Sequence, residues 1–262
     1  MQLGETIVEI GPGHGALTIP LAEAAKKIGA RIIAVEKDAA LAEILENRMR
    51  QIEKTAGNKN EDEKGGGKVK IIVGDALDFL KTMDAGLHAG LRADKIVGNI
   101  PYYISGHLLR VIGELEAKPQ LAVLMLQKEV AERICAAPPK MNRLGASVQY
   151  WAEPKIIAGV SKTEFSPAPT VDSAVIELEA KLETGQEQIS TSSAEGYYAA
   201  VRALFAQPRK TIINNILQAD GGHTRADVEA ALMKLGLNLK ARPQNLTIKN
   251  IAQVAEVFFR KI

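Results

Sequence analysis

The sequence has a single cysteine, Cys135, which excludes an internal disulfide and favours a chain that works in the cytoplasm. No apolar run reaches the roughly 18 residues of a membrane-spanning helix, and no basic segment followed by an apolar stretch opens the chain. The few histidines stand in unrelated contexts, so no metal site is predicted. They are His14, His88, His107 and His223.

The 262 residues suffice for one large domain, or for a medium domain followed by a small one. Charge is distributed unevenly along them. Residues 202–262 carry ten Lys or Arg against four Asp or Glu, whereas the remainder carries 23 against 27. A basic C-terminal part indicates an anionic partner, although a solvated helical surface would show the same excess.

Segments of strand and helix character alternate over the first half of the chain, which predicts a parallel sheet covered by helices on both faces. Segments 155–160 and 173–180 indicate a strand pair that closes this sheet. The fold class is therefore α/β. Strands are expected at 6–11, 31–38, 93–100 and 120–127 and from residue 69, with helices at 15–28, 39–53, 105–116 and 128–136.

Two polar segments interrupt this pattern. Residues 54–68 include three consecutive glycines and predict a surface loop, whereas residues 183–193 are rich in Gly, Ser and Thr and predict a domain boundary. Four helical patterns follow, with Ser192 or Ser193 as the cap of the first and Thr224 as the cap of the third. We therefore expect an α/β domain over 1–182 and a small helical domain over 183–262, with helices at 194–206, 210–218, 224–235 and 247–260.

The stretch EIGPGHGALT, residues 9–18, places Gly11, Gly13 and Gly15 between the first strand and the first helix. Glycines permit a tight turn and let a ligand approach the bare backbone, while the helix behind them offers unpaired N–H groups. The turn predicts a nucleotide-type ligand, although it also fits the G-x-G-x-x-G/A fingerprint of NAD-binding proteins. A plain tight turn is the structural alternative.

Carboxylates stand at the ends of the next two strands. Glu36 lies 21 residues beyond Gly15, where a carboxylate can accept both hydroxyls of a ribose, and Asp75 could accept a hydrogen bond from an adenine amino group. Asp78 is expected to begin a helix. Because ligands of open α/β folds bind outside the carboxyl ends of the strands, these groups predict a single site.

The fourth strand ends in NIPYY, residues 99–103. The Asn99 amide oxygen and a backbone carbonyl of Ile100 or Pro101 give two neighbouring acceptors, and Pro101 interrupts the strand ladder. An aromatic amine presents two N–H groups in one plane, and Tyr102 can stack on the ring that carries them. The run predicts a cradle for the amino group of an extruded nucleobase, for which an oxidoreductase has no use.

These motifs resemble, in order, those of the KsgA-type ribosomal RNA adenine dimethyltransferases. EIGPGHGALT, VEKD, GDALDF and NIPYYIS resemble the successive motifs of the catalytic domain. The later signatures are resembled by TEFSPAPTVDSAV (163–175), LFAQPRKTIINNI (204–216) and GLNLKARPQNLT (236–247). The resemblance covers essentially the whole chain and implies a Rossmann-like class I methyltransferase sheet with helices on both faces, followed by a small C-terminal helical domain.

The resemblance also implies S-adenosylmethionine as the cofactor and N6 of adenines in small-subunit ribosomal RNA as the target. Tyr102 would stack on the base and Phe165 would cover its opposite face. For Lys37, a plain solvated side chain is the alternative to a role in cofactor binding. The implied catalytic residues are Asn99, Ile100, Pro101, Tyr102 and Phe165, and the implied cofactor-binding residues are Glu9, Gly11, Gly13, Gly15, Glu36, Lys37, Asp75, Ala76 and Asn99.

The implied partner is the immature small ribosomal subunit of the 30S type, bound by a monomer in the cytoplasm. Basic residues of the C-terminal domain are expected to contact its phosphates, although each could equally be a plain surface charge. The RNA-binding candidates are Arg202, Arg209, Lys210 and Arg242. Three alternatives stay open: a large-subunit ribosomal RNA adenine methyltransferase, a non-catalytic ribosome-assembly factor that keeps the fold, and an NAD-dependent oxidoreductase.

The sequence departs from the family pattern at two places. Members usually carry a Q-x-F-L segment ahead of the first strand, whereas Met1 stands only five residues before it here. We expect either a truncated chain or a shortened variant, with weaker closure of the cofactor pocket in both cases. Tyr103 stands where an asparagine is common, which should leave the acceptor pair unchanged.

Overall fold

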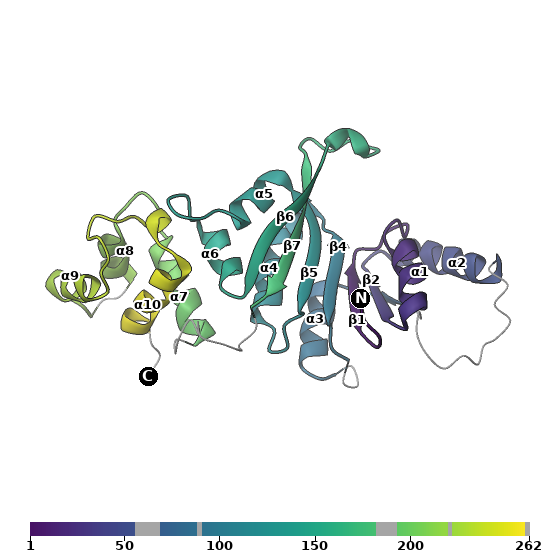
Figure 1. Ribbon diagram of the computed structural model, residues 1–262, viewed down its shortest axis with the longest axis horizontal. Coiled ribbons are helices and arrows are strands. Elements are labelled where there is room, and N and C mark those ends of the chain that lie inside the picture. Colours follow the sequence, from purple (N-terminus) through teal and green to yellow (C-terminus); the bar gives the residue numbers. More distant parts are fainter. Residues whose placement is uncertain (56–68, 88–90, 182–192, 220–221, 260–262) are drawn as a thin grey trace. The chain divides into compact units, whose positions relative to one another are not determined.

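The computed structural model describes residues 1–55, 69–87, 91–181, 193–219 and 222–259 (Figure 1). The chain forms two compact units. Unit 1 comprises Met1–Lys128 and Lys155–Ala180, and unit 2 comprises Glu129–Pro154 and Lys181–Ile262. Most of the loop expected at 54–68 and of the boundary segment expected at 183–193 lies outside the described residues.

Unit 1 is built on a seven-stranded sheet with the strand order β3-β2-β1-β4-β5-β7-β6. The first five strands run parallel, and β7 runs antiparallel to β5. This confirms the expected α/β fold. The strands are β1 (Thr6–Ile10), β2 (Arg31–Glu36), β3 (Val69–Val73), β4 (Lys95–Asn99), β5 (Leu121–Gln127), β6 (Ala152–Val160) and β7 (Ser173–Ala180).

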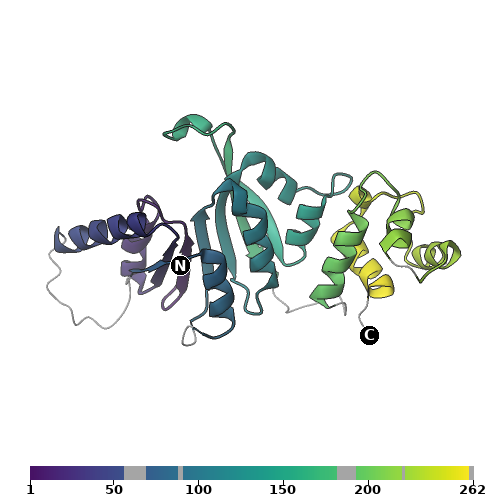
Figure 2. The same ribbon diagram turned by 180° about the vertical axis from the view of Figure 1, so that it is seen from behind.

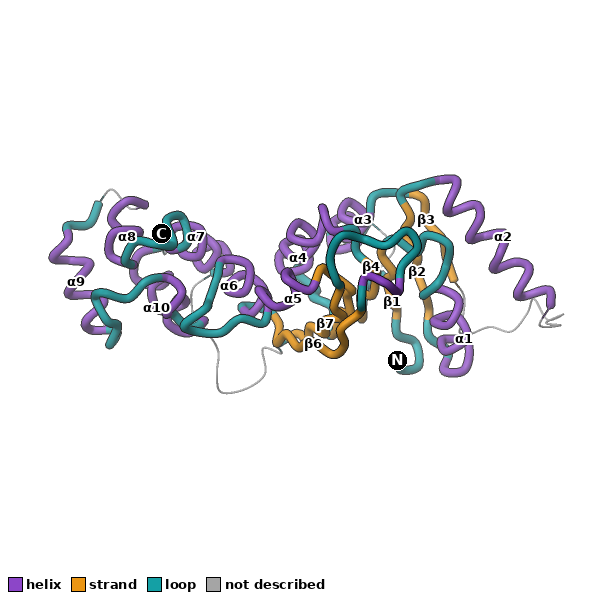
Figure 3. Tube along the Cα trace, turned by 90° about the horizontal axis from the view of Figure 1, so that it is seen from above, coloured by secondary structure: helices purple, strands orange, loops and turns teal. Residues whose placement is uncertain are grey.

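The central strand β1 is buried along its whole length, as expected for a strand covered on both faces. Since right-handed crossovers join consecutive parallel strands, α1 and α2 share one face of the sheet and α3 and α4 share the other. Figure 3 shows α3 and α4 on one side of the strands and α1 on the other. The helices are α1 (Thr18–Ile28), α2 (Ala39–Thr55), α3 (Ala76–Asp84) and α4 (Ser105–Glu114), with short 3-10 turns η1 (Tyr102–Ile104) and η2 (Lys162–Glu164).

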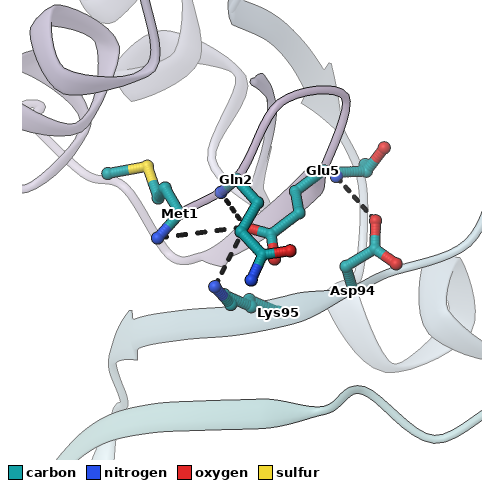
Figure 4. A network of polar contacts seen from close by, with 6 residues as sticks. Met1, Gln2, Glu5, Asp94 and Lys95 are labelled. Atoms are coloured by element: carbon teal, nitrogen blue, oxygen red, sulfur yellow. Dashed lines mark hydrogen bonds and ion pairs between the residues drawn. The ribbon is translucent and has the colours of Figure 1, made fainter. Parts of the chain in front are cut away.

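Polar contacts join the starts of β1 and β4 at the amino edge of the sheet (Figure 4). Glu5 is only 8% exposed. Its carboxylate accepts hydrogen bonds from Lys95 Nζ at 2.9 Å and from the Gln2 N–H at 2.5 Å. Beside it, the Asp94 carboxylate accepts the Thr6 N–H at 2.8 Å. These contacts tie the two central strands together at the edge opposite to their carboxyl ends.

Unit 2 is helical with its own apolar core, and α7 and α10 lie side by side in it (Figure 2). Tyr197 of α7 is fully buried in that core. Its ring stacks on Tyr150 with centroids 4.0 Å apart, and its hydroxyl donates to the Ala146 carbonyl at 3.0 Å. The helices are α5 (Lys128–Ile134), α6 (Arg143–Gln149), α7 (Ala194–Leu204), α8 (Ile212–Ala219), α9 (Arg225–Lys234) and α10 (Ile248–Phe258), with the 3-10 turn η3 (Pro243–Asn245).

The two-unit division differs from the expected single boundary at residue 182. Residues 129–154 join the helical unit because Met141, Ala146 and Tyr150 pack into its core. The expected caps are present: Ser193 Oγ accepts the Gly196 N–H at 3.2 Å at the start of α7, and Thr224 begins α9 with a capping box.

Candidate active site at the carboxyl edge of the sheet

Four loops meet where β1 to β4 end. Residue pairing places Ile10 beside Val35 on one side and beside Gly98 on the other, and Glu36 beside Val73. The glycine turn after β1 therefore lies between the acid that ends β2 and the Asn99 segment that ends β4. The structure brings the predicted motifs of these four strands to one edge of the sheet.

The three glycines of the turn differ in what they do. All have positive φ, with 65° at Gly11, 53° at Gly13 and 86° at Gly15, a region in which other residues are strained. A Cβ on Gly15 would clash with Leu45 Cδ1, so this glycine permits close packing against α2. A Cβ on Gly13 would meet no atom within 4 Å, so the backbone there faces open space and is accessible to a ligand.

Glu36 ties the glycine turn to the end of β2. The residue is 8% exposed, and its Oε2 accepts the Gly13 N–H at 2.9 Å while its Oε1 accepts the Asp38 N–H at 3.0 Å. Each carboxylate oxygen has a further lone pair. Glu36 can thus hold the turn and still accept hydroxyl groups of a ribose.

Asp75 is the cap of α3, which corrects the expectation that Asp78 begins this helix. Its Oδ1 accepts the Leu77 N–H at 2.9 Å, and Asp78 lies within the first turn. Its Oδ2 pairs with Lys37 Nζ at 3.1 Å. The Lys37 ammonium and the Leu77 N–H lower the pKa of Asp75, so this carboxyl is ionised at neutral pH. Ala76, the first residue of α3, is half-buried beside it.

Glu9 is a buried acid beneath the glycine turn. The residue is 1% exposed, and its Oε2 has no hydrogen-bond partner among the described residues; the same holds for Oγ1 of the buried Thr18 on α1. Burial raises the pKa of Glu9 to about 7; the nearby Thr18 hydroxyl opposes this rise and the Glu36 charge adds to it. A sealed acceptor without a partner is costly, which indicates that this group serves a ligand or holds a proton.

The Asn99 segment leaves the sheet with one backbone carbonyl unused. Asn99 is exposed, whereas the Ile100 side chain is buried and its N–H donates to the Met125 carbonyl at 3.1 Å. The carbonyl of the exposed Pro101 accepts the Ile104 N–H at 3.1 Å. No described residue donates to the Ile100 carbonyl, so this oxygen and the Asn99 amide are the acceptors that remain available.

Gly98 permits the close approach of β1 and β4 just before these acceptors. A Cβ at this position would lie 2.7 Å from the Ile10 carbonyl oxygen and 2.8 Å from Ile100 Cδ1. Any side chain would therefore push the two strand ends apart. The glycine in the middle of IVGNIP is needed for packing rather than for a turn.

Tyr102 is half-buried and fixed by a hydrogen bond across the sheet edge. Its hydroxyl lies 3.0 Å from Oγ of Ser173, the buried first residue of β7. Because β7 runs antiparallel to β5 and pairs Ser173 with Gln127, it begins at the edge where the parallel strands end. The role of Ser173 was not predicted, although the serine of the 163–175 signature was the available signal.

Phe165 lies in the connection between β6 and β7, directly after η2, and is partly exposed. Asp172 holds the base of this connection: its Oδ1 accepts the Lys162 N–H at 3.1 Å and its carbonyl accepts the Lys128 N–H at 3.0 Å. The connection thus leaves from the site's edge of the sheet. Among the described residues, no hydrogen bond or ring contact joins Phe165 to Asn99 or Tyr102.

The basic candidates of unit 2 lie on its surface. Arg202 is exposed on α7, Arg209 and Lys210 are exposed between α7 and α8, and Arg242 is exposed before η3. The Ile212 N–H donates to the Ala241 carbonyl at 2.9 Å and joins the last two of these segments. Three of the four cations therefore lie on adjoining loops.

Asn215 shapes one of these loops, and this role was not predicted from the sequence. It is 1% exposed; its Oδ1 accepts the Gln207 N–H at 3.2 Å, and its Nδ2 donates to the carbonyls of Gln207 at 3.1 Å and Thr211 at 3.3 Å. These bonds fold residues 207–211 back on α8. The loop that carries Arg209 and Lys210 is consequently fixed from inside.

The residues at the sheet edge fit S-adenosylmethionine. The open backbone at Gly13, the acceptors on Glu36 and Asp75 and the unpartnered acid Glu9 match a ligand with a ribose, an adenine and a positively charged amino-acid end. In the described ranges no helix is long and apolar enough to cross a bilayer, and no three His, Cys, Asp or Glu side chains gather as a metal site.

Comparison with solved structures supports the fold. A dimethyladenosine transferase from Plasmodium falciparum superposes with a TM-score of 0.71 at 22% identity, covering 97% of this chain and 90% of that one. The 23S ribosomal RNA methyltransferase ErmE superposes with a TM-score of 0.66 at 23% identity, covering 98% and 92%. The architecture is that of the Rossmann-like methyltransferases.

Sequence relatives narrow this class. Residues 2–259 match the family model described as ribosomal RNA adenine dimethylase. Ribosomal RNA small subunit methyltransferase A of Bacillus pumilus (strain SAFR-032) is 35% identical over 257 residues, 96% of this chain and 80% of the relative, and its namesake in Pelotomaculum thermopropionicum is 34% identical over 97% and 82%. The chain belongs to the ribosomal RNA adenine dimethylase family. This confirms the resemblance, the expected enzyme class and S-adenosylmethionine as the cofactor.

Proposed function

We propose that this protein transfers methyl groups from S-adenosylmethionine to N6 of adenines in small-subunit ribosomal RNA, as the names of its relatives suggest. One observation carries the proposal. The exposed amide of Asn99 and the unused Ile100 carbonyl end β4 directly beside the glycine turn that ends β1. Two acceptors for an exocyclic amine thus stand next to a nucleotide-type site.

Placement is the chemical task of these acceptors. The amino nitrogen of adenine is a poor nucleophile because its lone pair is shared with the ring, and S-adenosylmethionine supplies a strongly electrophilic methyl group on a sulfonium. Hydrogen bonds from N6 to Asn99 and to the Ile100 carbonyl pull the nitrogen toward tetrahedral geometry and hold it in line. Such alignment lowers the activation barrier by several kcal/mol, up to about 7 to 11. No strong base is needed.

The aromatic side chains would hold the base. Tyr102 stacks on one face of the extruded adenine, with its ring fixed by the 3.0 Å contact to Ser173. Phe165, on the connection that leaves from the same edge, covers the other face once RNA is bound. The pair would replace the stacking that the adenine loses on leaving its helix.

The cofactor would be held by the sheet-edge residues and the RNA by unit 2. Glu9, the three glycines of the turn, Glu36, Lys37, Asp75, Ala76 and Asn99 form the proposed cofactor site. Arg202, Arg209, Lys210 and Arg242 would contact phosphates of an immature small subunit. We further infer a monomer that acts in the cytoplasm, where bacterial relatives find their ribosomes.

The test is a methyl-incorporation assay on two substrates. Immature small subunits and protein-free large-subunit ribosomal RNA are each incubated with the protein and labelled S-adenosylmethionine, and the modified bases are identified by mass spectrometry. We expect N6,N6-dimethyladenine in the small-subunit RNA alone. Methylation of the large-subunit RNA alone, or binding to subunits without any methylation, would reject the proposal.

A further inference from the structure

The carboxyl of Glu9 sits in surroundings that disfavour its charge. In the central strand its register partners are Ala34 on β2 and Val97 on β4, both apolar. The residue is 1% exposed and Oε2 is sealed from solvent without a partner among the described residues. An ionised carboxylate in such a place loses its hydration, which the neighbouring Thr18 hydroxyl offsets only in part.

The charged and titratable groups around Glu9 add to this effect. Glu36, from β2, is the charged group that acts on it, and its charge is negative. Thr18, from α1, brings a neutral hydroxyl, and the glycine turn above brings N–H groups and the exposed side chain of His14. With a pKa raised to about 7, Glu9 carries its proton about half of the time at neutral pH.

We propose that Glu9 holds a proton in the free protein and releases it when the ammonium end of the cofactor binds under the glycine turn. The inference rests on the proposed cofactor site and adds a proton to its binding reaction. The O–H bond of the carboxylic acid breaks, the proton passes to the buffer, and the carboxylate that remains pairs with the ammonium. No electron is transferred.

The ammonium is the part of the cofactor that fits this role. A carboxylate without a partner requires hydrogen-bond donors, and an ammonium has three, whereas a sulfonium has none. A cation beside the carboxyl lowers its pKa, so binding and proton release favour each other. Binding at pH 7 should release about half a proton, and binding near pH 6 should release close to one.

Calorimetry measures this release directly. S-adenosylmethionine is titrated into the full chain at pH 6 and 7, where its amino group is mostly protonated, in buffers of different ionisation enthalpy, and the slope of the heat against that enthalpy gives the protons exchanged. S-adenosylhomocysteine, which keeps the ammonium and lacks the sulfonium, should release the same fraction. Methylthioadenosine, which lacks the amino-acid end, should release none. Glu9→Gln should bind with no release at any of these pH values.

The outcomes separate this inference from the proposed function. A wild-type heat of binding that does not depend on the buffer, or equal release by Glu9→Gln or with methylthioadenosine, overturns the role of Glu9 while leaving the cofactor site intact. Absence of any S-adenosylmethionine binding rejects the cofactor site itself. The wild-type slope decides the question even if Glu9→Gln fails to fold.

Discussion

The Glu36 carboxylate accepts the backbone N–H of Gly13 over 2.9 Å, across 23 residues of sequence. The acid at the end of β2 therefore holds the glycine turn in place, beside the proposed cofactor site. Its other oxygen accepts the Asp38 N–H, so one carboxylate orders the loops after both β1 and β2. Cofactor affinity and order in the turn should consequently respond together to changes at this residue.

Glu36→Ala should weaken S-adenosylmethionine binding roughly 10- to 100-fold, because each hydrogen bond to a charged group contributes about 1.5–3 kcal/mol. Glu36→Gln keeps one acceptor and should lie between this variant and the wild type. Calorimetric titration gives the affinities. Glu43→Ala, an exposed acid on α2, is the matched control and should bind normally. An unchanged affinity in Glu36→Ala would mean that the ribose lies elsewhere.

Asn99→Ala should lower the rate of methyl transfer by roughly 100-fold, the scale of losing one preorganised hydrogen-bond partner, while cofactor affinity falls far less, because Asn99 is one member among several of the proposed cofactor site. The amide contacts the target amine in the proposed function, whereas the glycine turn and Glu36 hold the cofactor. Single-turnover rates and calorimetry separate the two effects. Asn47→Ala makes the same truncation on the exposed face of α2 and should change neither. Equal losses of rate and affinity would contradict the assigned role.

Much of the sheet was predictable because its strands are continuous apolar runs that end in Gly, Asp, Glu or Asn. The parallel arrangement then forces those ends to one edge, so the sequence alone predicts that Gly11, Glu36, Asp75 and Asn99 lie near one another. Short α6 was not predicted, since its seven residues give too few turns for a helical period. Helix α6 belongs to the helical unit because it packs against Tyr197, whose hydroxyl bonds to the Ala146 carbonyl of α6 although the two residues are 51 positions apart in the sequence.

Some contacts of the candidate site could not be predicted from the sequence either, because they depend on tertiary packing. Tyr102 and Ser173 are 71 residues apart, and only the antiparallel entry of β7 brings them within 3.0 Å. Asp75 rather than Asp78 caps α3 because β3 ends at Val73 and the helix begins at Ala76, directly after Asp75. Such outcomes depend on where the backbone turns, and two nearby aspartates fit a helix start equally well.

Two substitutions at Tyr102 distinguish the contribution of its ring from that of its hydroxyl group. Tyr102→Phe keeps the ring and should cost about 0.5–1.5 kcal/mol of unfolding free energy, with a methylation rate within tenfold of the wild type. Tyr102→Ala removes the stacking surface and should weaken RNA binding or turnover by the equivalent of about 1–3 kcal/mol. Ser173→Ala combined with Tyr102→Phe completes a double-mutant cycle in chemical denaturation. If the phenylalanine variant is as impaired as the alanine variant, the hydroxyl and not the ring carries the function.

The Glu5–Lys95 pair at the opposite edge should give the fold a defined pH dependence. Burial works to raise the pKa of Glu5, but hydrogen bonds from Lys95 and the Gln2 N–H outweigh it and lower that pKa below 4.5. Its contribution is therefore present above about pH 4.5 and is lost as the pH falls through the lowered value. Burial likewise works to lower the pKa of Lys95, and Glu5 outweighs it, so the lysine loses its contribution only above pH 10.5.

Lys95→Met should accordingly reduce the free energy of unfolding at pH 7 by about 1–3 kcal/mol, since it leaves a largely buried carboxylate with only the more distant Met1 ammonium, 3.9 Å from its Oε2, as a cation. Urea denaturation at pH 7 and at pH 3 measures the difference between the variant and the wild type. As the pH falls through the lowered pKa of Glu5, this carboxyl takes up a proton and the difference should shrink. The matched control is Lys70→Met, at an exposed lysine of β3. Lys118 is unsuitable as a control because it donates a hydrogen bond to the Leu115 carbonyl. A deficit that is the same at both pH values would show that the methylene chain of Lys95, and not its charge, stabilises the strands.

The loop fixed by Asn215 should set the salt dependence of RNA binding. Arg209 and Lys210 are exposed on it, so each is free to neutralise one phosphate. Replacing both with alanine should make the slope of log affinity against log salt shallower by roughly 1.4–1.8, the loss expected for two phosphate contacts. Fluorescence anisotropy with a small-subunit RNA fragment at several salt concentrations gives the slope. Lys234→Ala, an exposed lysine at the end of α9, is the control and should leave the slope unchanged.

Asn215→Ala keeps both cations but releases their loop, so it should weaken RNA binding with little change in the slope. If this variant instead binds RNA as the wild type does, the order of the loop contributes nothing and the charges act as independent surface groups.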